Sequence, residues 1–218
     1  MVNFAYVGNR VPSKYFITHG AGESDAGSKF LPAETGSYDA ALNDAGIENA
    51  NIVKYTSVIP TEAKEISLKD GLKTIAWGEV LESIMSQTNG TKGQNISAGV
   101  MLTQVSDHNG NYLGGFACEY SGQGKEEDAK ASLLKSVVGM IERRGYGTFT
   151  NPKFGEDNVT DKNYVIHPGH TWVWSDMKVT KRSGTVLAAV CFTEYKVPVM
   201  RTPSFTKKNR HKKHTRKR

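Results

Sequence analysis

The chain has 218 residues, of which 38% are hydrophobic and 23% are charged, and these proportions are typical of one soluble globular domain. It contains no run of about 18 apolar residues, which excludes a helix that spans a membrane. The net charge of +6 comes from the end of the chain, since residues 207–218 hold eight of the 28 Lys and Arg residues and no acid. We therefore expect a single domain over residues 1–206 and a basic, disordered tail over residues 207–218, which can contact nucleic acid through its phosphates.

The two cysteines and the first residues bear on the compartment. Cys118 and Cys191 each lie within an apolar run, which predicts two buried thiols in a reducing environment. The stretch Met1–Tyr15 mixes polar residues among its apolar ones and lacks the continuous apolar segment of a secretory signal. We therefore expect a cytoplasmic protein.

The first third of the chain predicts a strand, a turn and a helix. Lys14–His19 has the composition of a strand, and the glycine-rich Gly20–Gly27 that follows is typical of turns. Ser37 is a good N-cap for a helix over Tyr38–Ala45, and Gly46 is the expected left-handed stop of that helix.

The next segment predicts a strand and then an ambiguous stretch. Asn49–Ile59 is rich enough in Ile, Val and Tyr for a strand, and Pro60 ends it. Gly71–Gln87 fits both a helical and a strand pattern. Because the internal Gly78 weakens a helix, we expect a strand over the later part of this stretch.

The second half of the chain gives clearer signals. Ile96–Val105 and Tyr112–Ser121 predict a hairpin, since Asn109-Gly110 between them is a strong turn signal. Lys125–Arg144 has a helical apolar period, with acids in the first turn and a stop at Gly145. Residues 146–170 predict a long loop, and two further strands are expected over Thr171–Thr180 and Thr185–Tyr195. Several strands with one or two helices, without a repeated strand–helix–strand unit, indicate an α+β fold with largely antiparallel sheets.

Common catalytic and binding motifs are absent from the sequence. It contains no phosphate-binding loop, no dinucleotide fingerprint between a strand and a helix, and no paired-cysteine zinc site. His167 and His170 form an H-x-x-H pair in a Pro-Gly context without a nearby cysteine, and we do not expect them to bind a metal.

Three segments together resemble the pyruvoyl-dependent arginine decarboxylases. The longest, Gly36–Pro60, has an Asp near the start of a helix, an Ala-Gly-Ile turn, an Asn-bearing strand, a Thr-Ser pair and a Pro. Leu113–Tyr120 is similar to the family's strand ending in Glu-Tyr, and Gly20–Asp25 also matches. The resemblance covers roughly residues 14–145 and, more weakly, the closing strand up to Tyr195. Residues 146–183 are longer and more polar than the family pattern, and residues 207–218 have no counterpart in it. It implies an αββα-type sandwich with one long helix, as in the pyruvoyl-dependent histidine/arginine decarboxylase fold.

The resemblance implies that the chain cuts itself between Thr56 and Ser57, giving fragments 1–56 and 57–218. The Ser57 hydroxyl attacks the carbonyl of Thr56 and converts the amide to an ester, and elimination followed by hydrolysis leaves a pyruvoyl group at position 57. Such a group forms a Schiff base with the substrate amine and takes up the electrons when CO₂ leaves, so no diffusible cofactor is needed. Thr56 need only donate its carbonyl and tolerate a strained turn.

Three further residues match the family's active site. Glu119 corresponds to a general acid that protonates the substrate's α-carbon, and in strand register it shares a face with Leu113, Gly115, Ala117 and Ser121, where apolar neighbours raise a carboxyl pKa. The alternative is an edge-strand acid facing water. Asn51 corresponds to an amide that bonds groups at the cleavage point. Asp39 corresponds to an acid facing the guanidinium of arginine, although an acid in the first turn of a helix is favourable without any substrate.

The separation of Asn51 and Ser57 constrains the site. Six extended residues span about 20 Å, so the two cannot meet in one straight strand. Either the strand bends sharply or the site is shared between subunits, and the trimers or hexamers implied by the resemblance favour sharing.

Two alternative functions stay open. The same chemistry could act on another amino acid such as histidine, because Ser57 and Glu119 do not select the substrate. The chain could instead be a nucleic-acid-binding protein on an inactive decarboxylase scaffold, with binding through residues 207–218. The leading expectation is a decarboxylase that converts L-arginine to agmatine and CO₂.

Overall fold

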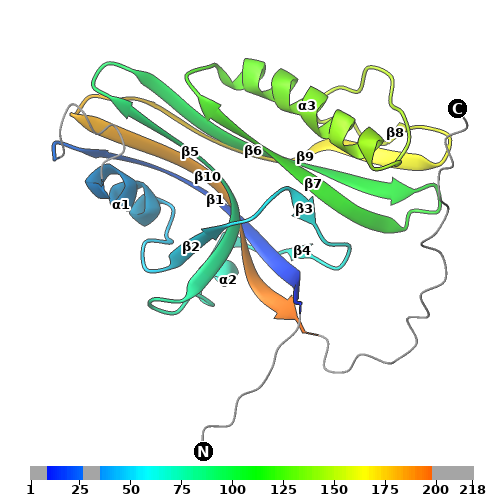
Figure 1. Ribbon diagram of the computed structural model, residues 1–218, viewed down its shortest axis with the longest axis horizontal. Helices are drawn as coiled ribbons and strands as arrows, with labels where there is room; N and C mark the ends of the chain where they lie inside the picture. Colours follow the sequence, from blue (N-terminus) through cyan, green and yellow to red (C-terminus); the bar gives the residue numbers. More distant parts are fainter. Residues whose placement is uncertain (1–8, 27–34, 198–218) are drawn as a thin grey trace, which may run out of the picture.

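The computed structural model describes residues 9–26 and 35–197, which form two five-stranded β-sheets packed face to face with helices outside (Figure 1). Sheet A has the strand order β2-β5-β10-β1-β4, made of β2 (Asn51–Lys54), β5 (Val80–Thr91), β10 (Ser183–Lys196), β1 (Val11–Ser24) and β4 (Lys64–Glu65). Sheet B has the order β3-β7-β6-β9-β8, made of β3 (Val58–Ile59), β7 (Tyr112–Gly122), β6 (Asn95–Asp107), β9 (Tyr164–Lys178) and β8 (Val159–Thr160). The basic tail predicted for residues 207–218 lies outside the described residues.

Most strand pairs are antiparallel, and the described exceptions are β1 with β4 and β2 with β5. Between the sheets lies a core to which both contribute alternate residues, including Ile84, Val100 and Phe192. Helix α1 (Thr35–Asp44) packs with α2 (Leu68–Leu72) on the outer face of sheet A, and α3 (Glu126–Arg143) covers the outer face of sheet B. The predicted α+β sandwich of αββα type, with one long helix, is therefore confirmed.

Local signals account for the hairpin and the long helix. β6 and β7 pair antiparallel, and Gly110 of the predicted turn has a φ of +80°. The predicted helix is α3, whose first turn contains three acids and which ends before Gly145 at φ +81°. Both predictions are confirmed. The sequence could predict these two elements because each depends on residues that are close in the chain.

The predictions for the first helix were partly wrong. α1 begins at Thr35, so Ser37 is not its N-cap but a buried residue within the helix, with its Oγ 2.9 Å from Oγ1 of Thr185. The stop was correct, since Gly46 has a φ of +75° and the Ile47 N–H donates to the Leu42 carbonyl. The Ser37 hydroxyl therefore forms a tertiary hydrogen bond to sheet A and does not cap the start of α1.

Two predicted turns or loops are strand instead. Gly20–Ser24 continues β1, because β10 pairs with every residue of that segment, and the glycines leave room for α1. Within the predicted loop 146–170, residues from Tyr164 onward belong to β9, where His167 lies opposite Gln104. The later strands were correct: β5 covers the later part of the ambiguous stretch, and β9 and β10 contain the two closing strands.

Candidate functional site

The Thr56-Ser57 pair lies where the chain leaves one sheet and enters the other. Up to Tyr55 the chain belongs to sheet A, since the N–H of Tyr55 donates to the carbonyl of Ser83 at 2.7 Å. From Ser57 it belongs to sheet B, since the carbonyl of Ser57 accepts from the N–H of Ala117 at 2.8 Å. The single strand predicted over Asn49–Ile59 is therefore two short strands, β2 and β3, at the edges of different sheets. The peptide bond between Thr56 and Ser57 is held at both ends by hydrogen bonds to rigid strands.

The expected strain at this pair does not take the form of a left-handed backbone. The described non-glycine residues with positive φ are Asn151 and Asn158, and the described residues have no cis peptide bond. The chain thus crosses between the sheets at Thr56-Ser57 without a positive φ or a cis peptide bond at either residue.

β7 brings Glu119 close to Ser57. Ala117, which bonds the Ser57 carbonyl, is two residues from Glu119, a separation of about 7 Å along a strand. Glu119 lies on the same inner face of sheet B as Ala117 and Gly115, as predicted, but its side chain is exposed, whereas Ala117 and Gly115 are buried. Leu113 does not share this face: it packs toward α3, because the register of β6 and β7 shifts between Val105 and Ser106.

The environment of Glu119 makes its carboxyl easier to protonate. Partial burial of its carboxyl raises the pKa of Glu119, although the side chain remains exposed, while its own backbone N–H and the charge of Lys54 act in the opposite direction. Lys54 is the last residue of β2 in sheet A, so its positive charge acts on Glu119 from the other side of the crossover. A carboxyl with a raised pKa is suited to donating a proton near neutral pH.

Asn51 lies at the other end of β2 from the crossover. Its Nδ2 donates to the carbonyl of Gly78 at 2.8 Å, and its N–H donates to the carbonyl of Glu79 at 2.7 Å. The chain does bend between Asn51 and Ser57, but the bend takes Ser57 to sheet B. Among the described residues no hydrogen bond joins Asn51 to Ser57 or Glu119.

Asp39 is exposed on α1, which packs against the outer face of sheet A. Asp39 is the fifth residue of α1 and does not lie in its first turn. The alternative role expected for Asp39, a favourable interaction of its charge with the N-terminal end of the helix, therefore does not apply. Ser57 is half-buried at the crossover, and the exposed Glu119 lies nearby on the strand that Ser57 bonds. Within one subunit, Ser57 and Glu119 therefore lie near each other, whereas Asp39 and Asn51 lie away from them.

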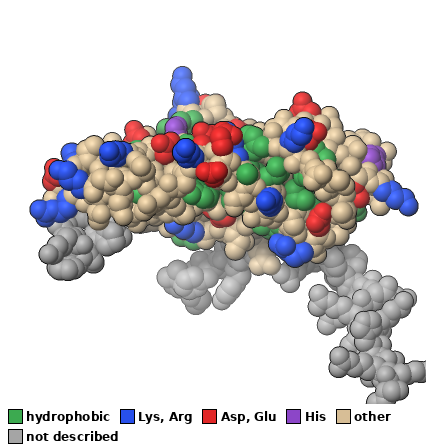
Figure 2. Space-filling model, turned by 90° about the horizontal axis from the view of Figure 1, so that it is seen from above, with side chains coloured by type: hydrophobic (Ala, Val, Ile, Leu, Met, Phe, Trp, Pro, Cys, Tyr) green, Lys and Arg blue, Asp and Glu red, His purple; other side chains and the backbone are tan. Residues whose placement is uncertain are grey.

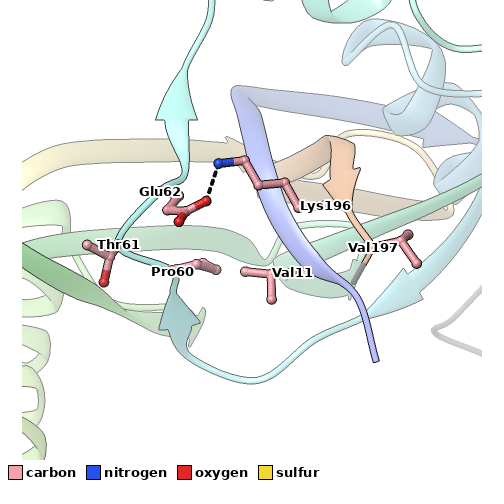
Figure 3. Close-up of a pocket in the computed structure, with 6 residues that line it drawn as sticks. All are labelled: Val11, Pro60, Thr61, Glu62, Lys196 and Val197. Atoms are coloured by element: carbon pink, nitrogen blue, oxygen red, sulfur yellow. Dashed lines mark hydrogen bonds and ion pairs between the residues drawn. The ribbon is translucent and has the colours of Figure 1, made fainter. Parts of the chain in front are cut away.

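A cavity of about 500 Å³ opens just after the crossover, but the predicted site residues do not line it. Its walls come from the start of β1, the turn after β3 and the end of β10, and Glu62 and Lys196 form an ion pair across it (Figure 3). It is lined by Val11, Pro60, Thr61, Glu62, Lys196 and Val197. The cavity and the crossover are neighbours in sequence, yet the residues that match the family's chemistry are found at the crossover.

A polar cluster that the sequence does not predict lies next to the crossover, where the buried Glu82 of β5 meets Arg10, Tyr55 and Tyr195. The strand pattern could have indicated this cluster, because Glu82 is two residues before Ile84 and therefore lies on the same inward face of β5. An acid at such a position is rare unless it is paired.

No group of three or more metal-ligating side chains occurs within residues 9–26 and 35–197. His167 and His170 both lie on β9, and burial lowers the pKa of His167, with the charge of His170 acting in the same direction. Cys118 and Cys191 are free and buried, as predicted. In the same two ranges, no helix combines the length and the apolar character that crossing a membrane requires.

Comparison with known proteins gives matches over most of the chain. The family model described as pyruvoyl-dependent arginine decarboxylase matches residues 14–197. A protein named pyruvoyl-dependent arginine decarboxylase AaxB from Chlamydia trachomatis serovar L2 is 44% identical over 152 residues, which are 63% of this chain and 77% of the relative. The protein of the same name from Chlamydia pneumoniae is 35% identical over 170 residues, 71% of this chain and 86% of the relative. A probable pyruvoyl-dependent arginine decarboxylase from Chlorobaculum parvum is 27% identical over 180 residues, 76% of this chain and 93% of the relative.

Proposed function

We propose, from the premise that this chain belongs to the pyruvoyl-dependent arginine decarboxylase family, that it converts L-arginine to agmatine and CO₂ with a pyruvoyl group made from Ser57. The main support for placing the site at Thr56-Ser57 is that the chain crosses from sheet A to sheet B there. Ser57 is the first residue to bond sheet B, next to the strand that carries Glu119. The Thr56-Ser57 bond is the proposed point of self-cleavage.

The fixed ends of the crossover support this cleavage. An intramolecular attack is fast when the reacting groups are held in a near-attack geometry. The hydrogen bonds of Tyr55 to Ser83 and of Ser57 to Ala117 hold the residues on either side of the Thr56 carbonyl. The chain itself then supplies the hydroxyl of Ser57 and the carbonyl that it attacks.

Each residue of the site has a proposed role. When formed, the pyruvoyl ketone supplies a carbonyl that condenses with the α-amino group of the substrate and accepts the electron pair released with CO₂. Glu119 holds a proton beside that position and delivers it to the substrate's α-carbon, which suits its raised pKa. Asn51 orients polar groups at the cleavage point, and Asp39 binds the guanidinium through a planar fork.

The roles of Asp39 and Asn51 need a second subunit, and an exposed apolar edge supports one. Trp77 is 86% exposed beside the start of β5, and Val53 and Val80 are 44% and 54% exposed on β2 and β5 at one edge of sheet A. Val58 is 50% exposed on β3, at the edge of sheet B where the chain leaves the crossover. Large exposed apolar groups clustered on a sheet edge are typical of protein interfaces. We propose that a second copy of this chain covers this edge, in a trimer or hexamer, and brings its Asp39 and Asn51 to the site.

The intact mass of the purified protein tests the assignment. We expect two fragments, with the larger one starting at residue 57 without a normal amino terminus, and release of CO₂ from arginine. Ser57→Ala should remain one chain. Thr56→Ser is the matched control, because it keeps the carbonyl that is attacked and should still be cleaved. One uncut wild-type chain with no CO₂ release would contradict the proposal.

The two alternative functions have less support. Assay against a panel of amino acids separates arginine from histidine, and the family match favours arginine. The nucleic-acid alternative depends on residues 207–218, which lie outside the described residues. On the face shown in Figure 2, basic and acidic side chains are interspersed and form no continuous basic surface.

A further inference from the structure

Glu82 is a buried acid on β5, the strand that bonds Tyr55 just before the proposed cleavage site. Its side chain is 9% exposed and lies on the face of β5 that also carries Ile84, toward the space between the sheets. The guanidinium of Arg10 forms an ion pair with its Oε1, while Oε2 is buried without a hydrogen-bond partner among the described residues. Acids in such surroundings are costly for the fold unless they are paired.

Aromatic rings flank this ion pair, in which Glu82 is buried and the Arg10 side chain is 47% exposed. The guanidinium carbon of Arg10 lies 4.8 Å from the centre of the Tyr195 ring, and the rings of Tyr55 and Phe192 are 5.6 Å apart. Burial acts to raise the pKa of Glu82, but interactions with the hydroxyls of Tyr195 and Tyr55 and with Arg10 prevail and hold it below its ordinary value. Glu82 is therefore ionised at neutral pH, and its charge faces Tyr55.

Tyr55 connects this cluster to the crossover. Its backbone N–H bonds Ser83, the residue after Glu82, and its side chain lies against Phe192, which is paired with Glu82 across β10 and β5. Both the backbone and the ring of Tyr55 are thus fixed by the same few residues. The next residue in the chain is Thr56, whose carbonyl is the proposed target of Ser57.

We propose that Glu82, with Arg10 as its counter-ion, is a positioning residue for self-cleavage that acts by holding Tyr55. This inference rests on the proposed function. In the step concerned, the Ser57 oxygen bonds to the carbonyl carbon of Thr56 and the C–N bond to Ser57 breaks. The hydroxyl proton passes to the freed nitrogen, so an ester and an amine replace the amide and the hydroxyl. Glu82 touches none of these atoms and fixes the orientation of the carbonyl through Tyr55.

The rate of cleavage after cell-free synthesis tests the proposal, followed by gel electrophoresis and intact mass. Glu82→Gln and Tyr55→Phe should each slow cleavage by about 10- to 100-fold, as expected for a small misplacement of reacting groups. The double variant should be no slower than the slower single variant, because both changes break the same connection. Arg10→Lys, which keeps the positive charge, should cleave faster than Arg10→Ala. The matched control is Glu194→Gln, which removes the exposed ion pair with Lys14 between β10 and β1, and it should cleave at the wild-type rate.

Two readouts separate positioning from a general loss of folding. The fraction of Glu82→Gln that does become cleaved should decarboxylate arginine at the wild-type rate per cleaved chain. The uncut precursor, compared in a Ser57→Ala background, should unfold cooperatively with and without Glu82→Gln. Wild-type cleavage by Glu82→Gln, multiplicative effects of the two variants, or equal slowing in Glu194→Gln would each overturn the proposal. An uncut wild-type chain would overturn the proposed function as well, whereas a cut wild type with an unaffected Glu82→Gln would overturn the role of Glu82 alone.

Discussion

The carbonyl oxygen of Ser57 accepts a hydrogen bond from the backbone N–H of Ala117, with the two atoms 2.8 Å apart. This bond joins the first residue after the proposed cut to the strand that carries Glu119 two residues further on. The proposed nucleophile and the proposed acid are therefore positioned by one sheet of one subunit. Sites built on strands hold their geometry better than sites built on loops.

Replacing Glu119 should separate the two reactions of the chain. Glu119→Gln removes the proton donor but leaves Ser57 and Thr56 in place, so we expect normal cleavage and a fall in decarboxylation of about 10²- to 10⁴-fold. Agmatine production and gel electrophoresis measure the two effects. Glu127→Gln, on an exposed acid of α3, is the control and should keep full activity. A Glu119→Gln enzyme that retains most of its activity would exclude the acid role.

The raised pKa of Glu119 also predicts a dependence of stability on pH. A carboxyl whose pKa is higher in the folded state contributes stability below its unfolded pKa, near the ordinary value of 4.5, and loses that contribution as the pH rises through the folded pKa. Glu119→Gln should therefore gain stability relative to the parent chain as the pH rises above about 4.5. Urea unfolding of uncut chains in a Ser57→Ala background measures this difference, and a difference that shrinks as the pH rises would contradict the prediction.

Asp39 should affect substrate binding and leave cleavage unchanged. Asp39→Asn keeps the shape of the side chain but removes the charge that pairs with a guanidinium, which corresponds to about 10- to 100-fold weaker binding. We expect a higher KM for arginine with a smaller change in kcat. Glu48→Gln, on the turn after α1, is a control for general charge effects. An unchanged KM in Asp39→Asn would place guanidinium recognition elsewhere.

α1 is seated on β1 by two glycines, and Gly22 tests this contact. A Cβ at Gly22 would lie 2.3 Å from the backbone nitrogen of Ala41 and 2.5 Å from the carbonyl oxygen of Ser37. Gly22→Ala should therefore lower the free energy of unfolding by about 1–3 kcal/mol, measured by urea titration. The control is Gly139→Ala within α3, where the nearest atom is the end of the Arg143 side chain. That change should raise stability by about 0.5–1 kcal/mol, since alanine is a better helix former.

The exposed edge at Trp77 should be required for assembly. Trp77→Lys puts a charge into the proposed interface and should give single chains in size-exclusion chromatography with light scattering. We expect arginine decarboxylation to fall with the loss of the oligomer, while circular dichroism stays that of a folded chain. Leu68→Lys changes an apolar side chain of α2 that is 42% exposed and should leave assembly intact. A Trp77→Lys chain that assembles normally would place the interface on another surface.

The sequence predicted those parts of the fold that depend on neighbouring residues. The turn at Asn109-Gly110 and the end of the helix at Gly46 follow from local backbone preferences, and both are found. The turn predicted at Gly20–Gly27 is wrong over Gly20–Ser24, which is strand, because Gly20 and Gly22 leave room for the contact between β1 and α1, which is a tertiary contact. The prediction of Ser37 as an N-cap is wrong for the same reason, since its hydroxyl forms a hydrogen bond with that of Thr185.

The candidate site was predictable only as a set of matched residues. The pairing of Ser57 with Ala117 depends on the chain changing sheets within three residues, and composition gives no sign of this change. The cluster at Glu82 depends on Arg10 and Tyr195, which lie far away in the chain. Such sites are defined by strand order, and no local pattern specifies the strand order of two packed sheets.

The place of β1 has a consequence for the chain after a cut at the crossover. β1 belongs to residues 1–56, yet its two neighbours in sheet A, β10 and β4, belong to residues 57–218. The two fragments would thus be interleaved strand by strand and could separate only by dismantling the sheet. Their reassociation after denaturation would become a bimolecular reaction whose rate depends on concentration, as in fragment complementation, whereas the uncut precursor folds as one molecule.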